Sequence, residues 1–142
     1  MSKILYNLFL VLYSLGVRLT SVWNSKAASW VNGRKNIFVE INEKLQNTDG
    51  KHIWMHCASL GEFEQGRPLL EELKQRYPEN KVVLTFFSPS GYEVMKEYEG
   101  ADYVFYLPMD SVSNAKNFIE AVNPVLVLSV IYEYWYYYLQ QL

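Results

Sequence analysis

The sequence has 142 residues, of which 50% are hydrophobic and 20% are charged. This balance excludes a disordered chain, and the length suffices for one domain with a core of its own. The single cysteine, Cys57, excludes an internal disulfide and fits a reducing compartment. His52 and His56 lie close to it in the sequence, but no second Cys/His pair completes a tetrahedral site. We therefore predict structural roles for these three residues and no metal site.

The first 39 residues are basic. They contain five basic and no acidic residues, which leaves a net charge of −7 for the rest of the chain. The basic residues are Lys3, Arg18, Lys26, Arg34 and Lys35. A basic leader in front of an acidic body indicates contact with an anionic surface, and the apolar neighbours of these residues favour lipid over nucleic acid.

Residues 4–23 predict an amphipathic helix. Its apolar stripe repeats at intervals of three and four residues and consists of Leu5, Leu8, Leu12, Leu15, Leu19 and Val22. The uncharged stretch 4–17 is shorter than the ~20 residues that span a bilayer. We expect the helix to lie in the membrane interface, with Trp23 and Trp30 at the depth of the lipid headgroups. The alternative is that the stripe packs on the protein's own core or on another domain.

A second helical pattern covers about residues 26–45 and ends in the loop 47–50. Residues 1–46 are thus predicted to be a membrane-associated helical region. Residues 51–142 form the second predicted domain, in which apolar runs alternate with helical segments. Strands are expected at 52–57, 81–87, 102–107 and 125–130, and helices at about 61–77, from the turn 88–90 to 98, at 111–122 and from 132 onward.

Near-continuous apolar strands separated by helices indicate an α/β fold, with a Rossmann-like parallel sheet and helices on both faces. The sequence stops soon after the fourth strand, in the aromatic segment 132–142. A large aromatic surface there would otherwise be exposed, so we expect this chain to be the N-terminal half of a two-domain enzyme.

Open parallel sheets bind their ligands beyond the carboxyl ends of the strands. The segments at this edge are 59–62, 88–91, 108–110 and 132–134. The sequence has neither GxGxxG nor GxxxxGK[ST], so it predicts no dinucleotide or P-loop phosphate site, and we expect no cofactor.

Four motifs occur in the order HCASLGEFEQGRPLLEELKQRYP, LTFFSPSGYE, ADYVFYLPMD and NPVLVLSVIYEYWYYYL. Together with the hydrophobic leader, they resemble the N-terminal domain of the 3-deoxy-D-manno-octulosonic acid (Kdo) transferase family over about residues 4–142. The resemblance implies a two-domain GT-B glycosyltransferase, in which this half receives the lipid acceptor and a C-terminal half, absent here, binds CMP-Kdo. It also implies an enzyme on the cytoplasmic face of the inner membrane. Such an enzyme transfers Kdo to a lipid A precursor in lipopolysaccharide assembly, with inversion and without a metal.

The resemblance assigns roles to two carboxylates. Glu62 matches the catalytic base, which accepts the proton of the acceptor. Glu133 matches the carboxylate of the family's E-[LIF]-W motif, which stabilises the transition state and reads Glu133-Tyr134-Trp135 here. The sequence departs from the family pattern at Ile131, where a polar or charged residue is expected.

The residues alone leave another reading open for both carboxylates. Ser59 and Glu62 have the spacing of a capping box, in which the two side chains satisfy amides at a helix start without any chemistry. Glu133 is equally consistent with a surface residue at the start of a helix.

Two turns are predicted to bind substrate. Ser59 and Gly61 form the first, where the missing side chain of Gly61 lets a sugar hydroxyl approach the backbone. Ser88, Ser90 and Gly91 form the second, whose amides are suited to hold an anion. The alternative for the second turn is helix capping by its serine.

Two other functions remain open from the sequence. One is a non-catalytic module that docks on membranes or binds lipid. The other is a GT-B enzyme that uses a different sugar nucleotide.

Overall fold

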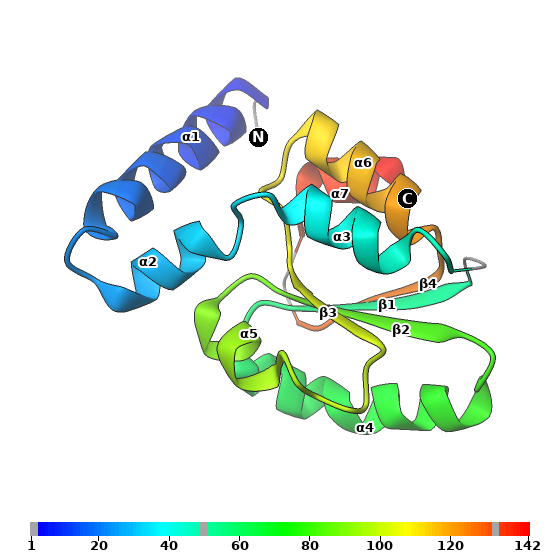
Figure 1. Ribbon diagram of the computed structural model, residues 1–142. Coiled ribbons are helices and arrows are strands. Elements are labelled where there is room, and N and C mark those ends of the chain that lie inside the picture. The colour runs from blue at the N-terminus through cyan, green and yellow to red at the C-terminus, as the bar shows by residue number, and fades with distance from the viewer. Residues whose placement is uncertain (1–2, 49–50, 132–133) are drawn as a thin grey trace. The chain divides into compact units, whose positions relative to one another are not determined.

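The computed structural model describes residues 3–48, 51–131 and 134–142 (Figure 1). The elements follow one another as α1 (Lys3–Thr20), α2 (Ser25–Asn32), α3 (Ile37–Leu45), β1 (His52–Cys57), α4 (Leu60–Arg76), β2 (Lys81–Phe86), α5 (Pro89–Met95), β3 (Tyr103–Tyr106), α6 (Val112–Val122), β4 (Pro124–Ser129) and α7 (Tyr136–Gln141). The chain forms two compact units that divide between Lys35 and Asn36. The domain division predicted at residues 46–51 stays a prediction.

The first unit consists of α1 and α2. The rings of Tyr13 and Trp30 meet edge to face, with their centroids 5.8 Å apart. The guanidinium of Arg34 lies 4.2 Å from the centroid of the Trp30 ring. Asn24 caps α2, because its side chain accepts a hydrogen bond of 3.0 Å from the N–H of Ala27. The aromatic contact between Tyr13 and Trp30 therefore joins the two helices, and Asn24 fixes the start of the second.

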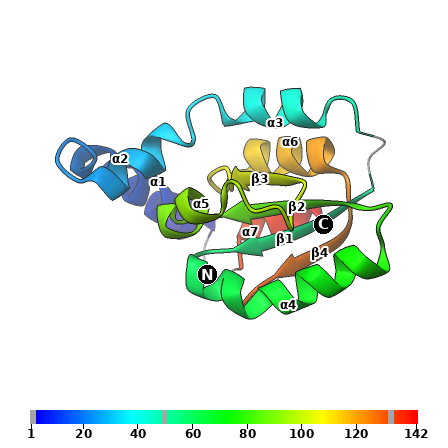
Figure 2. The same cartoon turned by 60° about the horizontal axis from the view of Figure 1, so that its bottom comes forward.

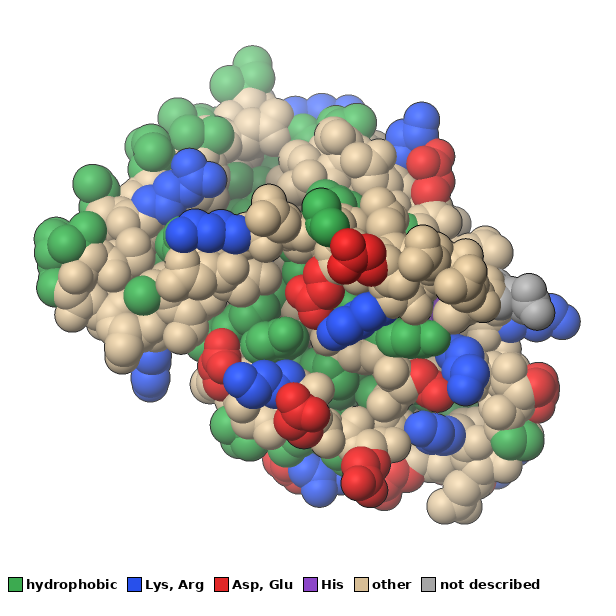
Figure 3. Space-filling model, viewed as in Figure 1, with side chains coloured by type: hydrophobic (Ala, Val, Ile, Leu, Met, Phe, Trp, Pro, Cys, Tyr) green, Lys and Arg blue, Asp and Glu red, His purple; other side chains and the backbone are tan. Residues whose placement is uncertain are grey.

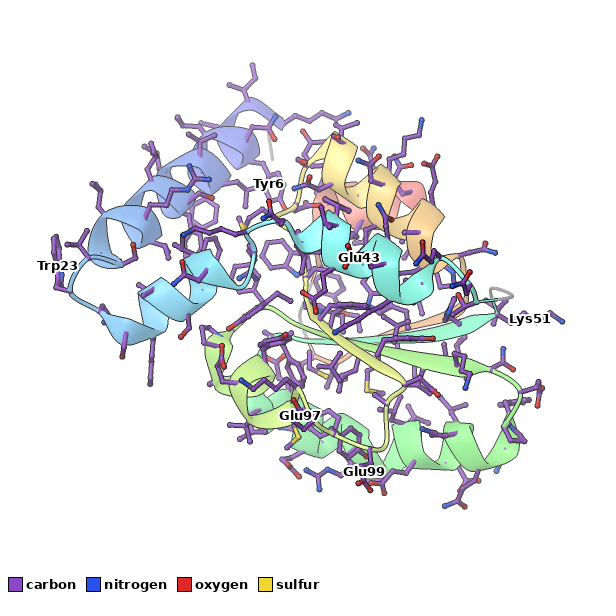
Figure 4. The ribbon with its side chains drawn as sticks, viewed as in Figure 1. Tyr6, Trp23, Glu43, Lys51, Glu97 and Glu99 are labelled. Atoms are coloured by element: carbon purple, nitrogen blue, oxygen red, sulfur yellow. The ribbon has the colours of Figure 1, made fainter. Side chains whose placement is uncertain are left out.

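The apolar stripe predicted for α1 is exposed. Its six side chains, Leu5, Leu8, Leu12, Leu15, Leu19 and Val22, are between 49% and 80% exposed. Trp23, which is also exposed, points away from the turn between α1 and α2 (Figure 4). By length and composition alone α1 is able to cross a membrane, so the flat orientation in the interface stays a prediction.

The predicted helix over 26–45 is two helices in the structure. α2 ends at Asn32 and α3 begins at Ile37. Asn36 stands between them with φ 56°, in the left-handed region. A right-handed helix cannot continue through this conformation, which asparagine tolerates better than most residues. The left-handed Asn36 therefore separates the start of α3 from the turn that follows α2.

The second unit is built on a four-stranded parallel sheet in the order β3-β2-β1-β4 (Figure 2). In the register, Trp54 of β1 pairs with Val83 of β2 on one side and with Val127 of β4 on the other. α4 and α5 cover one face, and α3, α6 and α7 lie on the other (Figures 1 and 2). The predicted α/β fold with helices on both faces is confirmed.

Both faces of the sheet carry a core. The core beneath α4 and α5 contains the fully buried Met55, Cys57, Phe63, Leu70, Val82, Leu84 and Phe86. On the other face, Trp54 packs against Phe118 of α6 and Tyr138 of α7, with ring centroids 4.9 and 5.7 Å apart. The two cores hold the central strands β1 and β2, and so fix the strand ends that carry the predicted site.

β4 is one of the two edge strands of the sheet, and it is more exposed than β3 at the other edge. Its only hydrogen-bonded neighbour among the described residues is β1. Val125 is 59% exposed and Leu126 is 38% exposed. The other edge strand, β3, is mostly buried, so an apolar run alone does not reveal how far the protein covers an edge strand.

His52 lies at the opposite end of β1 from the predicted site. The residue is 1% exposed, and its Nδ1 lies 2.5 Å from the carbonyl oxygen of Val122. Burial lowers the pKa of His52, against the opposing effects of the Val122 carbonyl and of Asp102. These contacts give His52 the structural role that the sequence predicts.

Candidate active site

The turns after β1 and β2 lie side by side at the carboxyl edge of the sheet. The N–H of Phe87 donates to the carbonyl of Cys57 at 3.3 Å. The N–H of Ser88 donates to the carbonyl of Ala58 at 2.8 Å. Two predicted substrate-binding turns, which are almost 30 residues apart in sequence, are thus joined through their backbones.

Glu62 occupies the first turn of α4. Its Oε2 accepts a hydrogen bond of 2.5 Å from the N–H of Ala58. In a capping box it would accept from the N-cap residue, Ser59, whose own side chain makes no capping hydrogen bond. The capping box predicted as the alternative is therefore only half formed, and it is shifted by one residue.

The Glu62 carboxylate keeps capacity for a second interaction. The residue is partly exposed, and among the described residues its Oε1 has no hydrogen-bond donor. The amides at a helix start favour a negative charge at this position. The backbone of Ala58 therefore fixes the carboxylate in place, while one oxygen is left to accept a proton.

Gly61 precedes this carboxylate and is exposed. A Cβ added at Gly61 would meet no atom within 4 Å. The packing of the described residues therefore gives no reason for a glycine at this position, and the backbone is open to an approaching group.

The second turn has a different construction. The hydroxyl of Ser88 caps α5 and accepts from the N–H of Ser90 at 3.2 Å. The hydroxyls of the two serines lie 3.0 Å apart. Gly91 is buried, and a Cβ added there would overlap the ring of Phe86. The capping alternative for Ser88 is confirmed, and substrate binding by this turn stays a prediction.

The segment after β4 carries the second predicted carboxylate. Glu133 itself lies outside the described residues. Ile131, two positions before it, has φ 62°. A β-branched residue in the left-handed region is a strained outlier that costs about 1–3 kcal/mol and persists only where the surroundings enforce it.

Val130 and Trp135, on either side of Ile131, both contact His56 of β1. The N–H of Val130 donates to the carbonyl of His56 at 3.0 Å. The indole N–H of Trp135 donates to Nε2 of His56 at 3.2 Å. The ring of Trp135 also packs on Phe87, with the centroids 4.8 Å apart. The ends of β1, β2 and β4 are therefore linked around His56.

Asp110, from the loop after β3, holds the beginning of α7. Its two carboxylate oxygens accept from the N–H groups of Tyr137 at 3.0 Å and Tyr138 at 3.2 Å. Asp110 is buried, and the positive end of α7 favours its charge. The aromatic segment, which the sequence left without a defined partner, is thus anchored to the sheet edge.

The sequence did not single out His56 as part of this edge. Alternation along β1 places its side chain on the face of Trp54, which agrees with the structure, because Trp54 and His56 both hydrogen bond to the hydroxyl of Thr85 at 2.9 Å. The contact with Trp135 joins residues 79 positions apart. Only the strand order, which brings β4 next to β1, makes this contact predictable.

Comparison with known proteins shows the family of the chain. Residues 33–142 match the family model described as 3-deoxy-D-manno-octulosonic-acid transferase (kdotransferase). The chain belongs to the Kdo transferase family. The 3-deoxy-D-manno-octulosonic acid transferase of Aquifex aeolicus is 37% identical over 94 residues, which cover 66% of this chain and 26% of the relative. That of Haemophilus influenzae is 39% identical over 85 residues, which cover 58% of this chain and 20% of the relative.

A more distant relative has a second activity in its name. The bifunctional glycosyltransferase/methyltransferase of Fusobacterium nucleatum is 27% identical over 103 residues, which cover 67% of this chain and 16% of the relative. The chain thus spans about a quarter or less of the length of the Kdo transferases and other relatives that it matches. The family match includes α3, the whole sheet and both turns of the candidate active site.

Proposed function

We propose that this chain is the acceptor-binding part of a glycosyltransferase that transfers Kdo from CMP-Kdo to a hydroxyl of a lipid A precursor. Membership of the Kdo transferase family supports the transfer of Kdo. The observation that carries the proposal is Glu62, a partly exposed carboxylate at the carboxyl edge of the sheet with one oxygen held by Ala58. No cofactor takes part, and CMP-Kdo binds to a C-terminal domain beyond these residues.

Glu62 is the general base in this reaction. Its carboxylate takes the proton from the acceptor hydroxyl as the hydroxyl oxygen attacks the anomeric carbon of Kdo. The bond between that carbon and the phosphate oxygen of CMP breaks, and CMP leaves with the electron pair. Attack on the face opposite the leaving group inverts the anomeric centre. The hydrogen bond from Ala58 keeps the base in one orientation, which favours catalysis by positioning.

Glu133 stabilises the transition state. Positive charge develops on the sugar ring as CMP departs, and a fixed carboxylate beside the ring lowers the energy of that state.

The acceptor lies across the two joined turns. The open backbone at Gly61 admits the reacting hydroxyl beside Glu62. Ser59 contributes a hydroxyl that no helix cap uses. Ser88, Ser90 and Gly91 bind the acceptor from the second turn, through the serine hydroxyls and the backbone.

The leader attaches the enzyme to the cytoplasmic face of the inner membrane. Figure 3 shows hydrophobic side chains projecting along α1. Exposed leucines on one face of a helix, with lysine and arginine nearby, suit an anionic lipid surface. Binding there brings the enzyme to the membrane that holds a lipid acceptor.

Replacement of the proposed base tests the reaction. In the full-length gene product in membranes, Glu62→Gln should lower Kdo transfer from CMP-Kdo by about 10²–10⁴-fold, because the amide cannot accept the proton. Glu64→Gln is the matched control, since Glu64 is an exposed residue on the same helix whose carboxylate pairs with Arg67. Near-normal turnover by Glu62→Gln contradicts the assignment of the base. Turnover with another sugar nucleotide in place of CMP-Kdo contradicts the assignment of the donor.

A non-catalytic membrane-docking module is the second candidate, and the exposed stripe of α1 favours it. The two candidates differ in what the carboxylate does. If docking were the whole function, Glu62→Gln would change neither Kdo transfer in the cell nor binding of the protein to vesicles. Leu8→Glu combined with Leu12→Glu should weaken binding to phosphatidylglycerol vesicles under either candidate, because it places charge on the apolar stripe.

A further inference from the structure

The two edges of the sheet are covered to different degrees. The edge strand β3 is mostly buried, and α3 lies over it, with Nζ of Lys44 5.3 Å from the centroid of the Phe105 ring. The edge strand β4 is partly or fully exposed along its whole length, and its Val125 and Leu126 are 59% and 38% exposed. The fold therefore protects one edge of its sheet and leaves an apolar strand at the other.

The backbone of β4 is turned outward along the same edge. The N–H of Val130 donates to the carbonyl of His56 in β1. Backbone groups of successive residues in a parallel ladder point alternately to the two sides of the strand, so the N–H of Val127 points away from β1. Among the described residues β1 is the only strand that pairs with β4. An apolar strand with amides directed away from its partner is suited to accept a further strand.

The path of the chain across the sheet determines where a following strand can lie. α4 and α5, on one face, lead from β1 to β2 and from β2 to β3 (Figures 1 and 2). α6, on the opposite face, leads back across the sheet from β3 to β4. Roughly 98% of connections between parallel strands are right-handed, which ties the face of the helix to the direction of the step. A connection on the face of α6 therefore steps from β4 to the position outside it.

The helix that follows β4 lies on this face. Tyr138 of α7 contacts Phe118 of α6 and Trp54 of β1, with the ring centroids 5.7 Å apart in both pairs. Asp110 holds the start of α7, because its carboxylate accepts from the N–H groups of Tyr137 and Tyr138. α7 thus continues the right-handed path, and the position that this path reaches next is the open edge of β4.

The relatives are long enough to supply such a strand. The match covers only 26% of the Aquifex aeolicus enzyme and 20% of that of Haemophilus influenzae. We propose that the edge of β4 is the docking surface for one further parallel strand, which follows α7 in the full-length gene product. The carboxyl end of a parallel strand there adjoins the sheet edge that carries the candidate active site. This pairing does not depend on the donor, the acceptor or the base of the proposed reaction.

Hydrogen exchange in the full-length gene product tests the pairing. The N–H of Val127 is followed by mass spectrometry at single-residue resolution, and the N–H of Leu128, which points to β1, is the reference for a paired amide. We expect Val127 to exchange at least a hundredfold more slowly than in the unfolded chain, because a strand outside β4 accepts its hydrogen bond. Protection of Leu128 without protection of Val127 overturns the proposal.

Thiol labelling tests whether the side chains of β4 are covered. Leu126→Cys is compared with Val94→Cys, a variant on the outside of α5 at a residue that is 59% exposed. Cys57 is fully buried, so labelling of the parent protein gives the background. We expect a maleimide to label Leu126→Cys at least tenfold more slowly than Val94→Cys in the folded protein, and at an equal rate in urea. Equal rates in the folded protein overturn the proposal. Val125→Cys replaces Leu126→Cys if that variant does not fold.

The two measurements also separate the strand from other occupants. Protection by the same chain is independent of concentration, so protection that disappears on about a hundredfold dilution shows a second copy and overturns the proposal. Slow labelling at position 126 with an unprotected Val127 amide shows a helix or loop as the cover and overturns it as well. Glu62→Gln should leave both measurements unchanged, whatever it does to Kdo transfer, so failure of the proposed function is seen separately.

Discussion

The turns after β1 and β2 are similar in sequence and different in structure. Each places a serine at the N-cap of a helix and a glycine within the first turn of that helix. Ser88 caps its helix and Gly91 is filled by Phe86, so helix formation and packing account for both residues. Ser59 makes no capping hydrogen bond with its side chain, and Gly61 faces open space. Neither helix formation nor packing therefore accounts for these two residues of the first turn. Where the fold does not require a residue type, function is the better explanation for it.

The largest stability difference should come from the two glycines. Gly91→Ala should destabilise the protein by about 1–3 kcal/mol, because the new methyl group overlaps the buried Phe86 ring. Urea unfolding measures this change. A stability equal to that of the parent protein would show that the second turn is as open as the first.

The two serines should differ by a smaller amount. Ser88→Ala removes a hydrogen bond to the N–H of Ser90 and should cost about 1 kcal/mol. Ser59→Ala removes no capping bond and should stay within about 0.5 kcal/mol of the parent protein. The same urea titration serves for both variants. Equal losses of stability in the two variants would contradict the difference in capping between Ser88 and Ser59.

Gly61→Ala should have the smallest effect on folding and a clear effect on transfer. The variant should be at most about 1 kcal/mol more stable, since alanine is the better helix former and the site has room for its methyl group. Kdo transfer should nevertheless fall, because that methyl group occupies the proposed approach of the acceptor hydroxyl. Unchanged transfer in a stable variant would argue that nothing binds close to this backbone.

Local sequence pattern predicted the central sheet well. The apolar run 52–57 coincides with β1, and 125–130 differs from β4 by one residue. Long apolar runs bounded by turn residues identify strands because both the burial and the boundary are encoded locally. The left-handed Asn36 and the exposure of β4 were not predicted. One is the conformation of a single residue, and the other depends on how far the rest of the protein covers an edge strand.

The site was predictable in part. Spacing located Glu62 at a helix start, but it could not show that the amide of Ala58, in place of that of Ser59, would bind the carboxylate. That choice depends on the orientation of one peptide group. The hydrogen bond between His56 and Trp135 joins distant parts of the chain, so it follows only from the arrangement of the strands.

The exposed position of β4 has a practical consequence for work on this chain. Apolar edge strands offer amide and carbonyl groups to other strands, and proteins commonly protect them with lysine. Solutions of these 142 residues alone should therefore form oligomers through β4 as the concentration rises. Light scattering should reveal them, and Val125→Lys should suppress them without altering either turn. A soluble, monomeric sample of this kind would make the stability measurements interpretable.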